Sequence, residues 1–195
     1  MSTLLAMCLF SLTMSITPGP VNIIVCSTSI NHGFKRALPF VSGATMAFTL
    51  LVAALGAGVG SFLSQYPTVL ELLGYCGGAF LCYIGYQIAI SDAVVSKAQK
   101  PPATFLDGAL LQLLNPKAWA ACLAGITTFK LGGNTDLLIK FVGIYFVICY
   151  LAIALWALVG SHAKILLQTP KHIEMLNIVM GGGLILLALY MQMPQ

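Results

Sequence analysis

Apolar residues in this chain form six long runs that are separated by short, more polar segments. A helix needs about 20 mainly apolar residues to cross the hydrocarbon core of a bilayer, and each run meets that requirement. The pattern therefore predicts an all-α polytopic membrane protein with about six transmembrane helices in a single domain, residues 1–195. The expected spans are Thr3–Ser29, Leu38–Phe62, Thr68–Ile90, Phe105–Phe129, Leu137–Val159 and Ile173–Met191.

Composition supports lipid as the surrounding medium. Residues of the set AVILMFWYC make up 59% of the chain, charged residues 7%, and the mean hydropathy is +0.96. Soluble domains carry about 25% charged residues, so a soluble chain of this composition would lack polar surface to cover its core. The net charge of +4 comes from basic residues scattered between apolar runs, without a cluster. We therefore expect no nucleic-acid partner.

The first apolar run lacks the features of a cleavable signal peptide. No Lys or Arg precedes it, and from Leu4 onward it is longer than a usual signal-peptide core. We expect it to be the first span.

The basic residues of the linkers predict the orientation of the spans. The first, third and fifth linkers carry two Lys or Arg each, the second carries none, and Lys130 and Lys140 flank the fourth. Cytoplasmic loops are enriched in Lys and Arg. The odd linkers should therefore be cytoplasmic, with both termini outside the cytoplasm.

The two halves of the chain share a weak internal repeat, with units at about 1–91 and 104–195. Thr17-Pro18-Gly19-Pro20 interrupts the first span, and Asn115-Pro116-Lys117 interrupts the fourth. Units of three spans must have opposite topology. Inverted three-helix repeats with broken helices at matching positions are typical of secondary transporters, and the breaks indicate the binding site.

The segment Thr17-Pro18-Gly19-Pro20 is the first candidate part of that site. Two prolines remove two backbone donors, and the glycine between them permits unusual dihedral angles. Broken backbone at membrane depth is tolerated where protein or a water-filled cavity satisfies it. We expect Thr17, Pro18, Gly19 and Pro20 to line a substrate site with Asn22, whose amide can bind a carboxylate or an amine; a kink near the membrane interface is the alternative.

Asn115, Pro116 and Lys117 form the second candidate part. Lys117 lies inside an apolar stretch, where an ionisable group is costly and is by default a functional candidate. Its ammonium could pair with a substrate carboxylate or with carbonyl groups freed by Pro116. The alternative is snorkelling to the interface. A helix that starts near Thr104 would place Lys117 about 20 Å along its axis, too deep for easy snorkelling.

Carboxylates are absent from the middle of every predicted span. Glu71 and Asp107 lie near the starts of the third and fourth spans, where we expect solvation at the interface. The sequence therefore offers no acidic candidate for a proton relay.

The cysteines suggest neither a disulfide framework nor a metal site, and we expect no cofactor. All six lie in apolar stretches without a CxxC pair, as buried free thiols do. A different class of function stays open, a membrane thiol-electron carrier using Cys26 in the first span and Cys122 in the fourth. No motif pairs a nucleophile with a base, so we do not expect an enzyme.

Glycine pairs leave the oligomeric state open. Gly56 and Gly60, like Gly74 and Gly78, have the spacing that lets helices approach closely. They could serve packing within the chain or a homodimer.

Several segments together resemble the LysE/RhtB family of amino-acid exporters. They are Thr17–Pro20, the basic linker His32–Ala37, the third-span segment Gly77–Tyr86, Leu114–Lys117 and Leu176-Asn177 ahead of Gly181. The order of these features over nearly the whole chain is specific, and the chain is faintly most similar to the cysteine/O-acetylserine exporters. The resemblance implies proton-driven efflux of small amino acids across the inner (plasma) membrane.

Overall fold

In the computed structural model, residues 3–59, 67–90, 101–166 and 170–191 are described, and their regular secondary structure is helical throughout. The all-α prediction is confirmed. Two of the six apolar runs are each divided into two helices. The elements are α1 Thr3–Ile16, α2 Pro20–His32, α3 Phe34–Ala54, the π-helix η1 Leu55–Val59, α5 Pro67–Ala89, α6 Phe105–Leu114, α7 Pro116–Thr128, α8 Thr135–Leu166 and α9 Pro170–Met191.

The number of spans stays a prediction. Among the described residues, Phe34–Gly58 and Thr135–Ala163 are each long and apolar enough to cross a membrane. The bent pair α1 and α2 would be a third span if the two helices are counted together. The six-span arrangement as two inverted repeats is not tested by these lengths. Residues 60–62 of the second predicted span and most of the third linker lie outside the described residues.

Two of the predicted linkers are shorter than the ends of the apolar runs indicated. Between α2 and α3, Gly33 alone is non-helical, at φ 86°, a left-handed conformation that favours glycine. Lys35 and Arg36 therefore belong to the first turn of α3. Helix α8 likewise continues to Leu166, well past the predicted end of its span at Val159.

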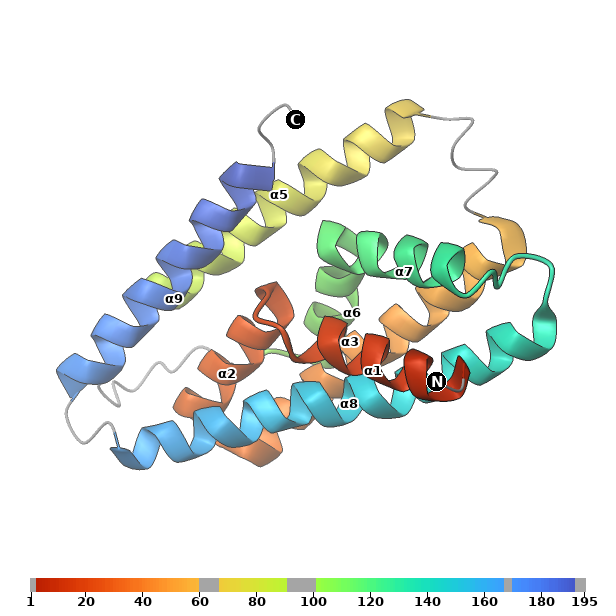
Figure 1. The fold of residues 1–195 in the computed structure, drawn as a ribbon. Helices are drawn as coiled ribbons and strands as arrows, with labels where there is room; N and C mark the ends of the chain where they lie inside the picture. The colour runs from red at the N-terminus through yellow and green to blue at the C-terminus, as the bar shows by residue number, and fades with distance from the viewer. Residues whose placement is uncertain (1–2, 60–66, 91–100, 167–169, 192–195) are drawn as a thin grey trace.

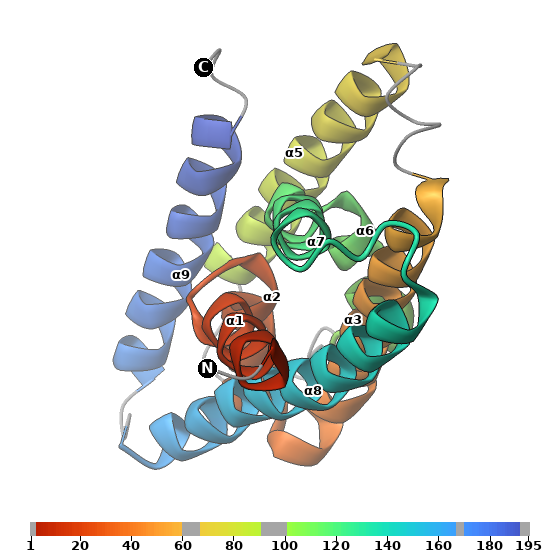
Figure 2. The same cartoon turned by 45° about the vertical axis from the view of Figure 1, so that its right-hand side comes forward.

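The helices form a bundle in which α3 and α8 are central. Helix α3 packs on α6 and α8, and α8 packs on α1 and α2 as well (Figure 1). Helices α5 and α9 pack on each other (Figure 2). Aromatic rings fill the core between α1, α3 and α8, with Phe141 and Tyr145 almost completely buried.

Glycines bring several helix pairs into backbone contact. A methyl group on Gly108 of α6 would collide with the Phe40 carbonyl of α3, and one on Gly43 would collide with the Phe105 carbonyl of α6. Gly85 and Gly181 are in the same relation between α5 and α9. In a bilayer no hydrophobic driving force pulls helices together. Small residues instead let the helices approach closely enough for van der Waals packing. These contacts lie within one chain and leave the homodimer untested.

The predicted glycine pair Gly56 and Gly60 is used at least in part within the chain. A methyl group on Gly56 would collide with the Leu138 side chain of α8. Gly60 lies outside the described residues.

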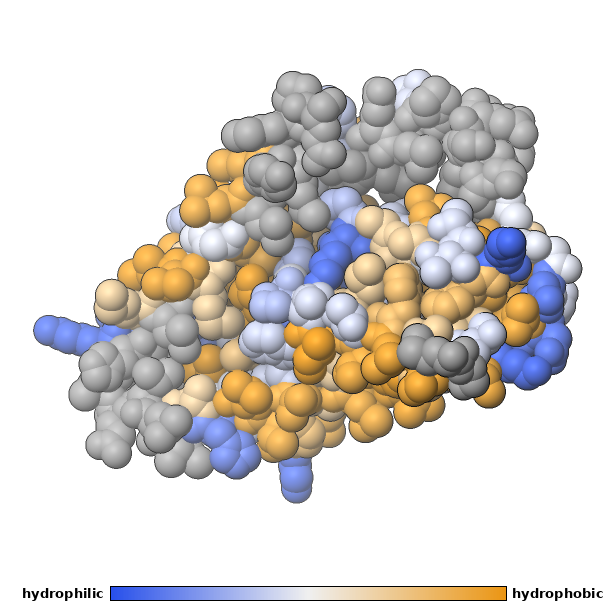
Figure 3. Space-filling view, in the orientation of Figure 1, coloured by the Kyte–Doolittle hydropathy of each residue, from blue (hydrophilic) through white to orange (hydrophobic). Residues whose placement is uncertain are grey.

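Apolar side chains cover much of the outer surface. Figure 3 shows broad hydrophobic areas, with hydrophilic residues toward both ends and at the lower edge and a further hydrophilic patch in the middle of this face. Exposed leucines such as Leu50, Leu151 and Leu186 belong to this surface, and the exposed ion pair Lys140–Asp136 lies at the start of α8. Such a surface fits contact with lipid chains.

The start of α6 is fixed by a capping box. The Thr104 backbone N–H donates to the Asp107 carboxylate at 2.7 Å, and the Asp107 N–H donates to the Thr104 hydroxyl at 3.3 Å. Asp107, which we expected to be solvated at the interface, thus also satisfies donors that the first turn leaves unpaired.

Candidate functional site

The first break separates α1 from α2, whose axes differ by 59°. Pro20 begins α2, where its missing N–H costs nothing, and Gly19 ahead of it is extended. The Asn22 side-chain amide donates to the carbonyls of Ser15 at 3.0 Å and Thr17 at 2.9 Å. These are carbonyls that the end of α1 leaves without helical partners. Asn22 therefore braces the break, and its amide nitrogen is used within the protein.

The second break separates α6 from α7 at Asn115. Pro116 begins α7, and the Asn115 side-chain oxygen accepts from the backbone N–H of Lys117 at 3.1 Å, which caps the helix. The Asn115 amide nitrogen lies 3.5 Å from the side-chain oxygen of Gln112. Trp119 donates its indole N–H to the Leu113 carbonyl at 2.7 Å. Local side chains therefore satisfy this break as well.

Lys117 joins the two breaks. Its ammonium donates to the Thr17 carbonyl at 2.8 Å, the Thr17 hydroxyl at 2.9 Å and the Pro18 carbonyl at 3.2 Å. No carboxylate among the described residues forms an ion pair with it; the ion pair present there is Lys140–Asp136. The positive charge of Lys117 is therefore held by neutral oxygens.

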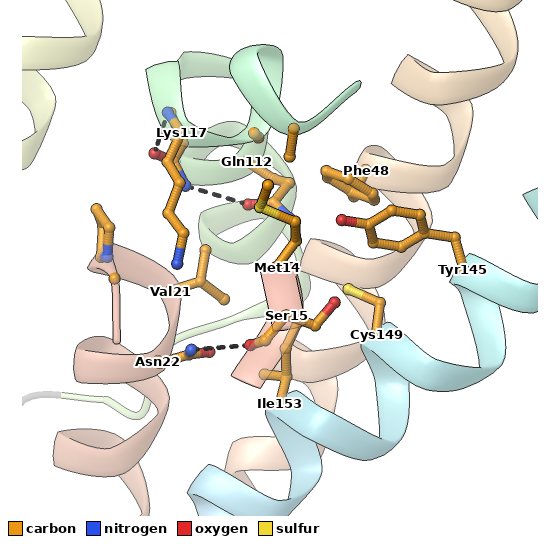
Figure 4. A pocket seen from close by; sticks show the side chains of 15 residues that line it. Met14, Ser15, Val21, Asn22, Phe48, Gln112, Lys117, Tyr145, Cys149 and Ile153 are labelled. Carbon is orange, nitrogen blue, oxygen red and sulfur yellow. Dashed lines mark hydrogen bonds between the residues drawn. The ribbon is translucent and has the colours of Figure 1, made fainter. Parts of the chain in front are cut away.

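A cavity lies beside these contacts (Figure 4). Of the predicted residues, Gly19, Pro20, Asn22, Asn115 and Lys117 line it. Thr17 and Pro18 instead hold the Lys117 ammonium, and Pro116 begins α7 without lining the cavity. The lining also includes Met14, Ser15, Val21, Phe48, Gln112, Ala118, Ala121, Tyr145, Cys149 and Ile153.

Several polar lining residues were missed by the sequence reasoning. Ser15, Gln112, Tyr145 and Cys149 lie in apolar runs on three different elements, so only the fold reveals that they meet. A weak signal existed for two of them, because Ser15 precedes Thr17 by two residues and Gln112 precedes Asn115 by three.

The cavity has an electropositive corner. Val21 and Asn22, the first residues of α2 with backbone N–H groups, line it, and no side chain caps this helix. The N-terminus of a helix carries partial positive charge. The N-terminus of α7, in contrast, is capped by Asn115. The Lys117 ammonium and the start of α2 together suit an anionic group.

Cysteine positions give no support to the thiol-carrier alternative. The six cysteines are free thiols, and neither Cys26 nor Cys122 lines the cavity. The backbone of Cys26 packs on Gly160 of α8, whereas Cys122 lies buried near Cys149. Among the described residues, no group of three His, Cys, Asp or Glu side chains could hold a metal ion.

Comparison with known proteins identifies the family. The LysE type translocator family matches residues 12–194 of the chain. The chain belongs to the LysE family. The resemblance seen in its motifs is thereby confirmed, and the chain is a membrane transport protein.

The chain is also similar to named proteins of comparable length. The cysteine/O-acetylserine efflux protein of Escherichia coli strain K12 is 28% identical over 181 residues, covering 88% of this chain and 88% of the relative. The protein of the same name from Salmonella typhi is 29% identical over 160 residues, covering 77% and 78%. No solved structure matches the chain significantly.

Proposed function

We propose that this LysE-family protein exports small amino acids or their derivatives across the inner (plasma) membrane and that the cavity is its substrate site. The observation that carries the proposal is the Lys117 ammonium, which joins both helix breaks beside a cavity and has no carboxylate partner among the described residues. The names of the two relatives, both amino-acid efflux proteins, support this substrate class.

The substrate carboxylate binds in the electropositive corner. Lys117 gives it a full positive charge, and the uncapped start of α2 adds backbone donors from Val21 and Asn22. Burying a carboxylate away from water is costly unless it is paired. Lys117 therefore turns from the Thr17 and Pro18 carbonyls toward the substrate.

The substrate ammonium binds the carbonyl oxygens that Lys117 releases, together with the side-chain oxygen of Gln112. Gln112 is buried and lines the cavity, and its oxygen has one long contact, from Asn115 at 3.5 Å. A zwitterion needs both kinds of partner, since either charge left unpaired would oppose binding. The site therefore favours amino acids over apolar solutes of equal size.

Alternating access follows from two inverted three-helix units that rock against each other around the site. Two helix contacts support this arrangement. Helix α3 of the first unit packs on α6, which begins the broken span of the second unit. Helix α8, which corresponds to α3 in the second unit, packs on α1, which begins the broken span of the first unit. A pseudo-two-fold axis would relate those two contacts. The proton gradient drives export, as the family resemblance implies.

Release from proteoliposomes tests the proposal. Vesicles containing the purified protein are loaded with radiolabelled L-serine, L-cysteine or O-acetyl-L-serine, and release is followed after a pH gradient is imposed. Matched solutes are ethanolamine, which is serine without the carboxylate, and 3-hydroxypropionate, which is serine without the ammonium. We expect release of at least one amino acid and of neither matched solute. Equal release of ethanolamine, or no release of any amino acid, would refute the proposal.

A further inference from the structure

Ser15 has a buried hydroxyl that lies near the side chains of Tyr145 and Cys149 but makes no hydrogen bond of good geometry within the described part of the chain. The residue is 9% exposed, lines the cavity, and its Oγ meets no donor or acceptor in hydrogen-bonding geometry among the described residues. Thr13, on the same helix, bonds its hydroxyl to the Leu9 carbonyl one turn back. Ser15 makes no such hydrogen bond to a carbonyl one turn back. Its hydroxyl is thus available to a group inside the cavity.

The hydroxyl lies on the side of the cavity away from the Lys117 ammonium. Figure 4 shows it directed toward Cys149 and Tyr145 of α8, to neither of which it makes a bond of normal geometry. The Ser15 backbone is fixed by the Asn22 amide at 3.0 Å. The same asparagine that braces the break therefore also holds the Ser15 hydroxyl in place.

We propose that Ser15 is the residue that selects the substrate side chain. This inference rests on the proposed function, in which Lys117 binds the substrate carboxylate. An amino acid anchored there directs its side chain across the cavity, toward Ser15, Tyr145 and Cys149. A side chain with a hydroxyl, thiol or ester oxygen hydrogen-bonds to Ser15. An alkyl side chain of equal size leaves the hydroxyl buried and unpaired, so the site discriminates against it.

Ser11 is a control position that distinguishes substrate selection by Ser15 from a purely structural role. It lies one helical turn before Ser15 and is completely buried, and its hydroxyl too meets no hydrogen-bond partner among the described residues. It does not line the cavity. A general effect of removing a buried hydroxyl from α1 would appear equally at Ser11 and Ser15, whereas substrate selection would depend on Ser15.

Binding to the purified protein in detergent tests the inference without requiring transport. The probes are L-serine, L-cysteine and L-2-aminobutyrate, whose side chains have the same shape and end in OH, SH and CH₃. Dissociation constants are measured for the unmodified protein, Ser15→Ala and Ser11→Ala. We expect the unmodified protein to prefer L-serine or L-cysteine over L-2-aminobutyrate. Ser15→Ala should reduce that preference about three- to tenfold, the effect of one hydrogen bond, and Ser11→Ala should leave it unchanged.

Each result decides the inference. Absence of the preference in the unmodified protein, its persistence in Ser15→Ala, or an equal loss in Ser11→Ala would overturn it. Selective binding that depends on Ser15, in a protein that releases no amino acid from vesicles, would refute the export function and leave the assignment of Ser15 standing.

Discussion

The Lys117 ammonium lies 2.8 Å from the Thr17 carbonyl, one hundred residues earlier in the chain. Each residue belongs to a helix interruption, so this hydrogen bond connects the broken span of the first half with that of the second. Changes at this contact or in the packing around it should therefore affect both halves of the chain.

Replacing Lys117 should abolish export. Lys117→Gln retains a hydrogen-bond donor but removes the charge, so a substrate carboxylate would lose its ionic partner. We expect release of amino acids from vesicles to fall to the level of protein-free vesicles. Lys140→Gln removes an equally charged but exposed lysine, whose pair with Asp136 is of the kind that contributes little, and should behave as the unmodified protein. Unchanged export by Lys117→Gln at equal abundance would show that the charge is not used.

Gly19→Ala should weaken export without unfolding the protein. The backbone of Gly19 is extended, which alanine adopts freely, but the added methyl group would lie 3.1 Å from the Lys117 ammonium nitrogen. The lysine must shift and lose part of its contacts, so we expect the export rate to fall about three- to tenfold. Gly132→Ala, where the methyl group meets nothing within 4 Å, is the matched control. Similar rates for both variants would argue against a defined position for Lys117.

Asn22→Ala should lower stability as well as export. The change leaves the Ser15 carbonyl without its Asn22 donor, and an unsatisfied buried polar group costs about 1–3 kcal/mol. The Thr17 carbonyl loses the Asn22 donor too but keeps the Lys117 ammonium. The thermal midpoint in detergent should therefore drop by several degrees. Asn31→Ala removes one similar bond, to the Ser27 carbonyl, away from the break, and should have a smaller effect. A larger loss for Asn31→Ala would contradict the bracing role of Asn22.

Gly108→Ala should disturb assembly of α6 on α3. Its methyl group would collide with the Phe40 carbonyl, and backbone cannot yield as a flexible side chain can. Overpacking of this kind costs about 1–3 kcal/mol. We expect less folded protein in the membrane, measured by size-exclusion chromatography after extraction. In Gly143→Ala, on α8, the methyl group meets nothing within 4 Å, and the yield should stay normal.

Topology can be tested with reporter fusions. The linker charges predict that both termini lie outside the cytoplasm and that the third linker lies inside. Reporters fused after Met191 and within Ser91–Thr104 should therefore give opposite signals. Residues 91–100 and 192–195 lie outside the described residues, so the fusions supply evidence that the fold does not. Matching signals would contradict the six-span arrangement.

Helix positions were largely predictable from the sequence, because hydropathy and proline act locally. The third predicted span, Thr68–Ile90, differs by one residue at each end from α5, and prolines marked both breaks. The π-helix η1, with Gly58 at φ 105°, was not predicted, since it gives no hydropathy signal. Helix α8 was predicted too short because its polar end continues helical beyond the apolar run.

The candidate site was predictable only around the breaks. Lys117 and the Thr17–Pro20 segment carried a local signal, a charge or a helix breaker within an apolar run. Tyr145 and Cys149 carried no such signal, because nothing in their local sequence distinguishes them from other residues of a membrane helix. They reach the site only because α8 packs beside α1. Asn22 stays a predicted substrate contact, and the fold adds a bracing role, because its amide nitrogen donates to the Ser15 and Thr17 carbonyls.

The three oxygens around the Lys117 ammonium also affect the substrate concentration at which the protein is active. Protein oxygens already coordinate the charge, so a substrate carboxylate gains only the difference between two sets of contacts. Such an exchange gives weak binding even with complementary charges. We expect half-saturation only when the cytoplasmic amino-acid pool is abundant. A low affinity set in this way would confine export to conditions in which amino acids are in excess. The normal supply that the cell needs for growth would then stay in the cytoplasm.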